Sequence, residues 1–234
     1  MWQSGAVSTR QDARRRIERR IIDLGRRQLA TDGAAALSVR AIARDLGMVS
    51  SAVYRYVASR DDLLTMLLLD AYTELADQVD EAAAAASDDW RARVRAIARA
   101  ARGWAVREPA RWALLYGSPV PGYHAPADRT VGPGTRVIAA LLGAVDAGIA
   151  AGEVAAPPAE VSGPTVRDFD GLREEFGFTG DDAVLLRCLA LWAGLVGAIS
   201  LEVFGQYGAD TLRDVPTVFD GQVDVLLGTL TAPD

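Results

Sequence analysis

Several residue types are scarce in this chain of 234 residues, and each shortage excludes a class of protein. There is no lysine, so all 25 basic residues are arginine. A single cysteine, Cys188, cannot form an internal disulfide, and a single histidine, His124, cannot supply a histidine-rich metal site. We therefore exclude extracellular disulfide scaffolds, zinc modules and proteases that use a Cys/His pair, and we expect neither a metal nor another cofactor.

Long hydrophobic runs are also lacking. The longest uncharged apolar stretch, 188–201, has 14 residues, whereas a membrane-spanning helix needs about 18 or more. No apolar stretch precedes the N-terminal arginine cluster, so no secretory signal is visible. We expect a cytoplasmic protein without a membrane partner, and its hydrophobic content of 50% is sufficient for a buried core.

Charge is unevenly distributed along the chain. Residues 1–60 contain twelve arginines and five acidic residues, a net charge of +7, whereas the remainder carries −13 and the whole chain −6. A basic segment suits a polyanion, because neutralising phosphates supplies most of the sequence-independent affinity for DNA. The alternative is a solvated basic helix or a disordered arm.

Apolar residues recur at helical spacing along most of the chain, with capping residues and breakers between the segments. The predicted helices cover 12–31, 38–46, 50–57 and 60–86, then begin near 87 and at 109, and cover 135–152, 181–207 and 215–230. Residues 118–134 and 153–180, which are rich in proline and glycine, are predicted loops. No segment alternates convincingly at period two, so the predicted fold is all-α.

Residues 38–57 have the spacing of a helix-turn-helix. Ser38 is the expected N-cap of its first helix, Ser50 or Ser51 that of its second, and Gly47 lies in the turn. Such a pair lets the second helix enter the major groove of DNA. The alternative is a helical hairpin buried in a bundle, but the large polar side chains of residues 54–60 would be hard to satisfy there.

Three motifs, within this segment and directly after it, resemble a known family. They are Ile-Ala-x-x-Leu-Gly at 42–47, Tyr-x-Tyr-Val at 54–57, and a basic residue directly before Asp-Asp-Leu-Leu at 61–64. With them, residues 12–75 resemble the DNA-binding domain of the TetR family of bacterial transcriptional regulators. The sequence departs from the family at Arg60, where lysine is usual, and at Ser51-Ala52, where glycine, proline or threonine is common.

The resemblance continues beyond this domain. Residues 102–123, with Trp-Ala, Glu-Pro and Pro-Val-Pro-Gly-Tyr, and residues 192–206 are similar to the C-terminal domain of one TetR subgroup. The resemblance implies an N-terminal three-helix helix-turn-helix domain followed by a larger helical ligand-binding and dimerisation bundle. We expect DNA binding in residues 1–60, with a flexible N-terminal arm, and effector binding and dimerisation in residues 61–234.

The expected DNA contacts combine this resemblance with the chemistry of each side chain. Arg40 is expected to read a guanine, or else to contact phosphate, and small residues at the start of the second helix to line the groove through hydroxyls and a thymine methyl. Tyrosine hydroxyls are expected on phosphates, although Tyr54 could instead be half-buried core. The expected DNA-binding residues are Ser38, Arg40, Ser50, Ser51, Ala52, Tyr54, Tyr56 and Arg60. The arginines of residues 14–20 are expected to attract phosphate diffusely or to form a minor-groove arm.

Aromatic residues with a few polar tips are the candidates for the implied effector pocket, because they suit a mostly apolar small molecule. They are Trp104, Trp112, Tyr116, Tyr123, His124 and Trp192. Each aromatic side chain could instead be ordinary core, and His124 lies in a proline-rich segment where a surface position is the alternative.

The predicted helix 181–207 is apolar nearly all round, so it needs cover on several sides. Together with 215–230 it suggests a four-helix interface between two copies of the chain. The expected interface residues are Leu185, Leu189, Val196, Ile199, Val203, Phe219, Val223 and Leu226. A purely intramolecular core is the alternative.

The sequence therefore predicts a ligand-responsive DNA-binding transcriptional regulator, a homodimer that represses from a (pseudo)palindromic operator and is released by a small effector. No glycine-rich phosphate loop, histidine triad or Glu-x-x-His pair is present, so we do not expect an enzyme. The remaining alternative is a helical interaction protein that has lost DNA binding.

Overall fold

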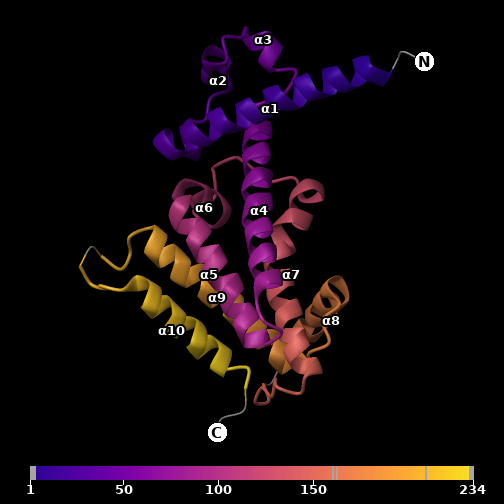
Figure 1. Ribbon diagram of the computed structural model, residues 1–234, viewed down its shortest axis with the longest axis vertical. Helices are drawn as coiled ribbons and strands as arrows, with labels where there is room; N and C mark the ends of the chain where they lie inside the picture. The colour runs from indigo at the N-terminus through magenta and orange to yellow at the C-terminus, as the bar shows by residue number, and fades with distance from the viewer. Residues whose placement is uncertain (1–3, 160, 162, 209, 232–234) are drawn as a thin grey trace. The chain divides into compact units, whose positions relative to one another are not determined.

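The computed structural model describes residues 4–159, 161, 163–208 and 210–231, which form helices joined by turns and loops, with no strand among these residues (Figure 1). The all-α expectation is confirmed. The helices are α1 (Ser4–Asp32), the 3₁₀ turn η1 (Ala34–Ala36), α2 (Val39–Asp45), α3 (Ser50–Val53), α4 (Arg60–Ala85), α5 (Trp90–Arg107), α6 (Pro109–Tyr116), α7 (Ala127–Ala150), α8 (Pro164–Phe176), α9 (Asp182–Val203) and α10 (Val215–Gly228).

Side-chain caps begin several helices, and the cap at Ser38 stands where the sequence predicted it. The Ser38 hydroxyl accepts a hydrogen bond from the Ala41 amide at the start of α2, and the Ser59 hydroxyl accepts one from the Asp62 amide at the start of α4. These bonds satisfy amides that have no partner inside the helix. The turn after α2 contains Gly47 at φ +66°, a conformation that favours glycine.

Two predicted boundaries were wrong. Helix α1 begins at Ser4 rather than near residue 12, so the expected flexible arm is helical from Ser4 onward. Helix α7 begins at Ala127 inside the predicted loop 118–134, and it contains Pro133. The proline removes one backbone hydrogen bond, but Thr130 and Val137 on either side of it are buried and anchor the helix.

The predicted loop 153–180 was wrong too, because it contains α8. Its breakers are the start and stop of the helix: Pro164 occupies the first turn, where no amide donor is needed, and Gly177 follows the last turn at φ +62°. Phe169 is buried and gives α8 its apolar anchor.

The chain forms two compact units. The first contains Met1–Thr73 and Pro109–Val131, and the second contains Glu74–Glu108 and Gly132–Asp234. The expected division at residue 60 differs from this one, because α4 begins at Arg60 and continues through the boundary between the units.

The first unit is built around one hydrophobic cluster, which we call the N-terminal core. Its buried members are Ile21, Leu24, Leu37, Val39, Ile42, Ala43, Val53, Val57, Leu63, Leu64 and Leu67. Leu114 of α6, with Val120 and Tyr123 of the segment after it, packs against this core. The Tyr123 hydroxyl lies 2.9 Å from that of buried Thr65 on α4, so the segment after α6 is fastened to the core by a polar contact as well.

An ion cluster on Asp70 joins three helices of the first unit. Arg26 of α1 donates from Nε and Nη2 to the two carboxylate oxygens of Asp70 on α4, at 2.7 Å each. Arg111 of α6 donates from Nη2 to Asp70 Oδ2 at 2.9 Å, and its side chain is almost fully buried. Because a buried guanidinium needs a counter-charge, Asp70 permits α6 to pack where it does.

The second unit packs α9 against α5, α8 and α10, and α5 also contacts α10. Trp90 is fully buried, and a Cβ at Gly148 would lie 2.6 Å from its ring, so this close approach requires glycine. Burial also raises the pKa of Cys188 to about 12, which keeps its thiol protonated. Ion pairs also join α5 to α9 and α10: Arg95–Asp224 and Arg99–Asp220 are exposed to solvent, whereas Arg102–Glu202 is partly buried.

Two helices, α7 and α9, are long and apolar enough by length and composition to cross a membrane. The length of the longest uncharged stretch, 14 residues, is therefore not sufficient by itself to exclude a membrane-spanning helix. The core helices of water-soluble proteins pass the same test, and α9 contributes core residues such as Leu185, Leu191 and Ile199 to the second unit.

We predict that Asp70→Asn lowers the free energy of unfolding by about 3 kcal/mol, because it leaves the buried Arg111 without its carboxylate. The matched control is Asp220→Asn, which breaks a solvent-exposed pair with Arg99 and is expected to cost less than about 1 kcal/mol. Urea denaturation of the full chain measures both. Equal losses for the two variants would contradict the structural role given to Asp70.

Candidate nucleic-acid interface

The helix-turn-helix is formed by α2, the turn at Gly47 and α3. Met48 follows the glycine and packs against the N-terminal core, and its amide donates to the carbonyl of Ala43 at 3.0 Å. Val53, at the end of α3, is fully buried in the same core. The turn is therefore fixed at both ends, and the residues between Met48 and Val53 are presented outward.

Helix α3 differs from the prediction in both length and cap. It ends at Val53 rather than Val57, and the chain continues as turns through Tyr56 because Val57 is drawn into the core. Its N-cap is Val49, not Ser50 or Ser51, and no side chain caps it.

The expected base-reading residues lie on the surface of this segment. Arg40 is exposed in the first turn of α2, Ser50 and Ser51 are exposed at the start of α3, and Ala52 is half-buried. Ser38 is half-buried, and its hydroxyl already accepts the amide of Ala41. Hydroxyl and guanidinium groups in this position are suited to base edges and phosphates.

The two tyrosines after α3 differ in their surroundings. Tyr54 is 42% exposed, so the half-buried alternative does not describe it. Tyr56 is half-buried and packs against the N-terminal core, and the Arg14 guanidinium of α1 lies 5.5 Å from the centre of its ring. This cation–π contact places a positive charge beside Tyr56.

Arg60 has a structural use that the sequence did not indicate. Its Nη2 donates to the carbonyls of Ala34 and Ala35 at 2.9 and 3.2 Å, and its Nη1 lies 3.6 Å from Asp61. The guanidinium therefore joins the η1 turn to the start of α4, and this contact holds the connection between α1 and α2.

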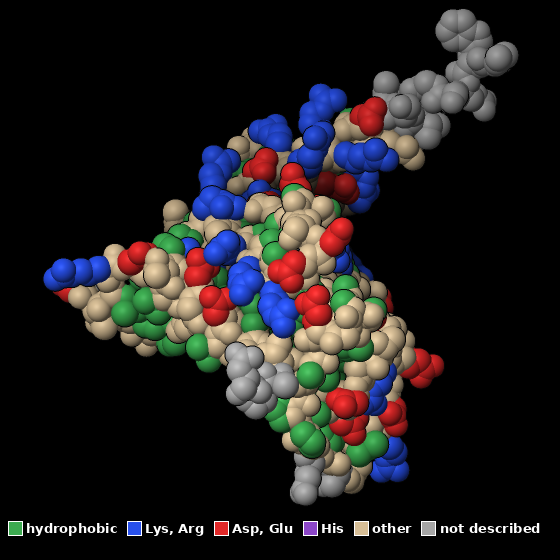
Figure 2. All heavy atoms as spheres, turned by 60° about the horizontal axis from the view of Figure 1, so that its bottom comes forward, with side chains coloured by type: hydrophobic (Ala, Val, Ile, Leu, Met, Phe, Trp, Pro, Cys, Tyr) green, Lys and Arg blue, Asp and Glu red, His purple; other side chains and the backbone are tan. Residues whose placement is uncertain are grey.

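Five arginines of α1 form a basic surface. Arg14, Arg15, Arg16, Arg19 and Arg20 are all exposed. Figure 2 shows arginine side chains gathered along α1 beside the N-terminal residues drawn in grey. A row of exposed guanidinium groups attracts the phosphate backbone of a duplex.

Four of the six effector candidates belong to the first unit. Trp112 is buried, and its ring centre lies 4.4 Å from that of Tyr116. Burial raises the pKa of Tyr116, as it does that of Tyr72, so both phenols stay neutral at physiological pH. Tyr123 contacts Thr65 as described above, and His124 is exposed.

The other two candidates belong to the second unit. Trp104 is fully buried and donates from Nε1 to Glu74 at 3.2 Å, whereas Trp192 of α9 is half-buried. The structure thus brings Trp112 and Tyr116 together, and it leaves Trp104 and Trp192 in a different unit.

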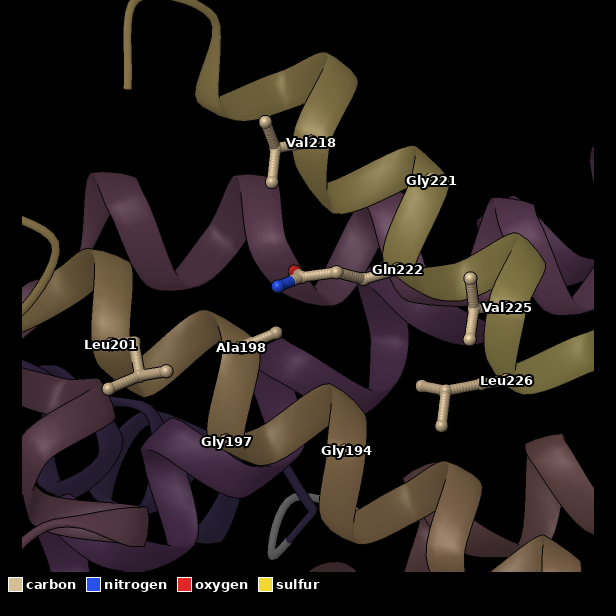
Figure 3. A pocket seen from close by; sticks show the side chains of 9 residues that line it. All are labelled: Gly194, Gly197, Ala198, Leu201, Val218, Gly221, Gln222, Val225 and Leu226. Atoms are coloured by element: carbon tan, nitrogen blue, oxygen red, sulfur yellow. The ribbon is translucent and has the colours of Figure 1, made fainter. Parts of the chain in front are cut away.

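A groove of about 710 Å³ lies between α9 and α10. It is lined by Gly194, Gly197, Ala198, Leu201, Val218, Gly221, Gln222, Val225 and Leu226 (Figure 3). Of these described lining residues only Gln222 has a polar side chain, and the glycines leave room for another backbone to approach.

The expected interface residues fall into two sets. Leu185, Ile199, Phe219 and Val223 are buried inside the protomer, so they have no surface left for a partner. Leu189, Val196, Val203 and Leu226 are half-buried. The apolar side chains exposed on these two helices are instead Leu186, Leu201 and Val225, with Phe204 directly after α9. Periodicity did not identify the outward face of α9, because α9 is apolar on every side.

Val49 was not among the expected DNA-binding residues. No local signal pointed to it, because Ser50 or Ser51 was the expected N-cap, whereas in the structure Val49 occupies that position.

Comparison with known proteins agrees with this architecture. Residues 21–67 match the family described as bacterial regulatory proteins, tetR family, and residues 94–226 match the tetracyclin repressor-like C-terminal domain. HTH-type transcriptional regulators from Mycobacterium tuberculosis and Mycobacterium bovis are each 61% identical to this chain over 231 residues, which cover 98% of the chain and 99% of each relative.

Solved structures show the same fold. The crystal structure of SCO4313, a protein described as regulatory, superposes with a TM-score of 0.76 at 34% identity and covers 93% of this chain and 98% of its own. A TetR-family transcription regulator from Shewanella sp. PV-4 gives a TM-score of 0.62 at 16% identity, with 93% and 99% covered, and supports the fold alone.

The fold and the exposed helix-turn-helix define a DNA-binding transcriptional regulator rather than an enzyme. The chain belongs to the TetR family, as the motifs in residues 37–64 and 102–123 predicted.

We predict that Arg60→Ala lowers the free energy of unfolding by about 1.5 kcal/mol, because two charge-assisted hydrogen bonds are lost. Arg60→Lys is the conservative control, since an ammonium can still donate to the same carbonyls, and it should recover most of that loss. Duplex titrations over a salt series separate this role from a phosphate contact. A salt slope that becomes shallower by about one unit in Arg60→Ala would contradict a purely structural role.

Proposed function

We propose that this TetR-family regulator is a homodimeric repressor, acting in the cytoplasm, which binds a (pseudo)palindromic operator and is released by a small, mostly apolar effector. The observation that carries the proposal is the arrangement of exposed Arg40, Ser50 and Ser51 on a helix-turn-helix whose other face is fixed to a core. In this proposal residues 1–60 supply the DNA contacts, and residues 61–234 supply effector binding and dimerisation.

Charge supports the DNA-binding part of the proposal. The exposed arginines of α1 belong to the same compact unit as α2 and α3, and Arg14 contacts Tyr56 directly. Phosphate contacts from α1 and Tyr54 would set the orientation of the protein, while the α2–α3 side chains would read the bases.

The groove between α9 and α10 supports the dimer. It is apolar, it is open to solvent, and exposed Leu201 and Val225 line it. A second copy related by a two-fold axis would cover both grooves with the same residues and present two reading segments to two half-sites.

Aromatic side chains support the effector. Tyr116, Tyr123 and Trp192 retain partial exposure, whereas buried Trp104 and Trp112 would contribute only after their packing opened. An effector that binds only the form unable to hold DNA would stabilise it by about 2.7 kcal/mol at a hundredfold excess over its dissociation constant. That free energy lowers operator affinity roughly a hundredfold.

Selection from a library of random-sequence duplexes tests the operator. We expect the full-length protein to enrich two half-sites in two-fold symmetry, about one helical turn apart or further. Arg40→Ala should relax the preference at one base pair in each half-site, because a bidentate contact to guanine is worth about 1–3 kcal/mol. Arg44→Ala, which removes an exposed arginine at the other end of α2, is the control and should leave the preference unchanged. Failure to enrich any sequence would refute operator binding.

Sedimentation analysis tests the dimer. The wild-type chain should sediment at twice the protomer mass of 24.9 kDa. Val225→Asp should weaken association about a hundredfold or more, because an unpaired charge buried in an interface costs about 3 kcal/mol. Val106→Asp changes an exposed valine of α5 outside the groove and should remain dimeric. A monomeric wild-type chain, or dimeric Val225→Asp, would refute this interface.

A further inference from the structure

Val49 stands at the N-terminus of the reading helix in a position that ordinarily belongs to a polar residue. It has extended backbone angles, φ −65° and ψ 141°, and its carbonyl accepts the amide of Ala52 at 2.9 Å. Its side chain cannot accept a hydrogen bond, so the free amides of α3 have no side-chain cap. Serine, threonine, aspartate and asparagine are strongly preferred at such a position.

Several other helices of the same chain follow that preference, whereas α8 begins after Gly163 without a side-chain cap. Ser38 caps α2, Asp89 caps α5, Asp181 caps α9 and Asp214 caps α10, each by accepting a backbone amide. With valine at its N-cap, α3 therefore lacks the stabilising hydrogen bond that the side-chain caps give to these other helices. A local rule broken in this way commonly marks a functional position.

The Val49 side chain is also 71% exposed, although it is apolar and β-branched. It follows Met48, which packs inward on the N-terminal core, and it precedes Ser50 and Ser51, whose hydroxyls are exposed. The backbone is thus fixed on one side of Val49, and the valine projects with the two serines from the start of the helix. In a helix-turn-helix this start of the second helix meets the base edges of the major groove.

We propose that Val49 is a specificity-determining residue that contacts the C5 methyl group of a thymine in each half-site of the operator. The thymine methyl is the apolar feature of the major groove, and van der Waals contact with it is how an apolar side chain distinguishes thymine from other bases. In this proposal Ser50 and Ser51 supply hydrogen bonds beside it, so the segment contacts one thymine methyl group and the polar groups of the adjacent base edges. This inference rests on the proposed operator binding.

Replacement of thymine by deoxyuridine removes only that methyl group and provides the test. The probe is the duplex that the wild-type protein enriches from a random-sequence library, with each thymine replaced singly by deoxyuridine. One position in each half-site should weaken wild-type binding about fourfold, as expected for one buried methyl group. Val49→Ser should bind the thymine duplex about sixteenfold more weakly, because the homodimer loses the contact in both half-sites, and it should not respond to deoxyuridine at that position.

Val49→Ser also restores a capping side chain, so its melting temperature should equal or exceed that of the wild type, which separates lost recognition from lost folding. Val106→Ser is the matched control: it changes an exposed valine of α5 and should keep the wild-type response to deoxyuridine. The proposal is overturned if no single deoxyuridine weakens wild-type binding, or if Val49→Ser responds to deoxyuridine as the wild type does. A library from which nothing is enriched refutes operator binding itself, so the two failures are distinguishable.

Discussion

The position of the reading segment depends on the N-terminal core, because α3 has only four residues and a helix of that length has no stability of its own. Val53 and Val57 are fully buried in this core, and Met48 packs against it. The short segment between Met48 and Val53 is therefore held by side chains on both of its flanks. The positions of its exposed residues are therefore set by the packing of the buried residues on either side.

The same core explains why α6 and the segment after it belong to the first unit despite their distance in sequence. Leu114, Val120 and Tyr123 pack against the core, and the Asp70 ion cluster joins α6 to α1 and α4. The motif Pro-Val-Pro-Gly-Tyr, which resembles part of a C-terminal domain, thus contributes packing to the DNA-binding unit.

Arginine, the only basic residue type in the chain, has two distinct uses. On α5, Arg95, Arg99 and Arg102 are paired with acidic residues of α9 and α10. Asp220 illustrates the result, because its hydrogen bond with Arg99 lowers its pKa below the ordinary value. On α1 most of the arginines are exposed, and residues 1–60 contain too few acidic residues to balance them.

Sequence reasoning succeeded where a local signal decided the structure and failed where packing decided it. Gly47 and Ser38 located the helix-turn-helix because turn and cap chemistry is local. Glycine and proline predicted loops over the first turns of α7 and over α8. Both predictions were wrong, because buried anchors such as Thr130 and Phe169 override local preference.

Tertiary contacts also decided points that no local pattern contains. The outward face of α9 could not be read from a helix that is apolar all round. Arg60 donates to the carbonyls of Ala34 and Ala35, which lie 26 and 25 residues earlier in the sequence. No spacing rule predicts such a contact.

Native-state hydrogen exchange tests most directly whether the core fixes the reading segment. The amides of Tyr56 and Val57 donate to the Val53 carbonyl, so their exchange reports opening of this segment. The account predicts that these amides open with the same free energy as the buried amides of α4, as parts of one cooperative unit. Rapid exchange at residues 56 and 57 while α4 stays protected would mean that the reading segment moves independently of the core.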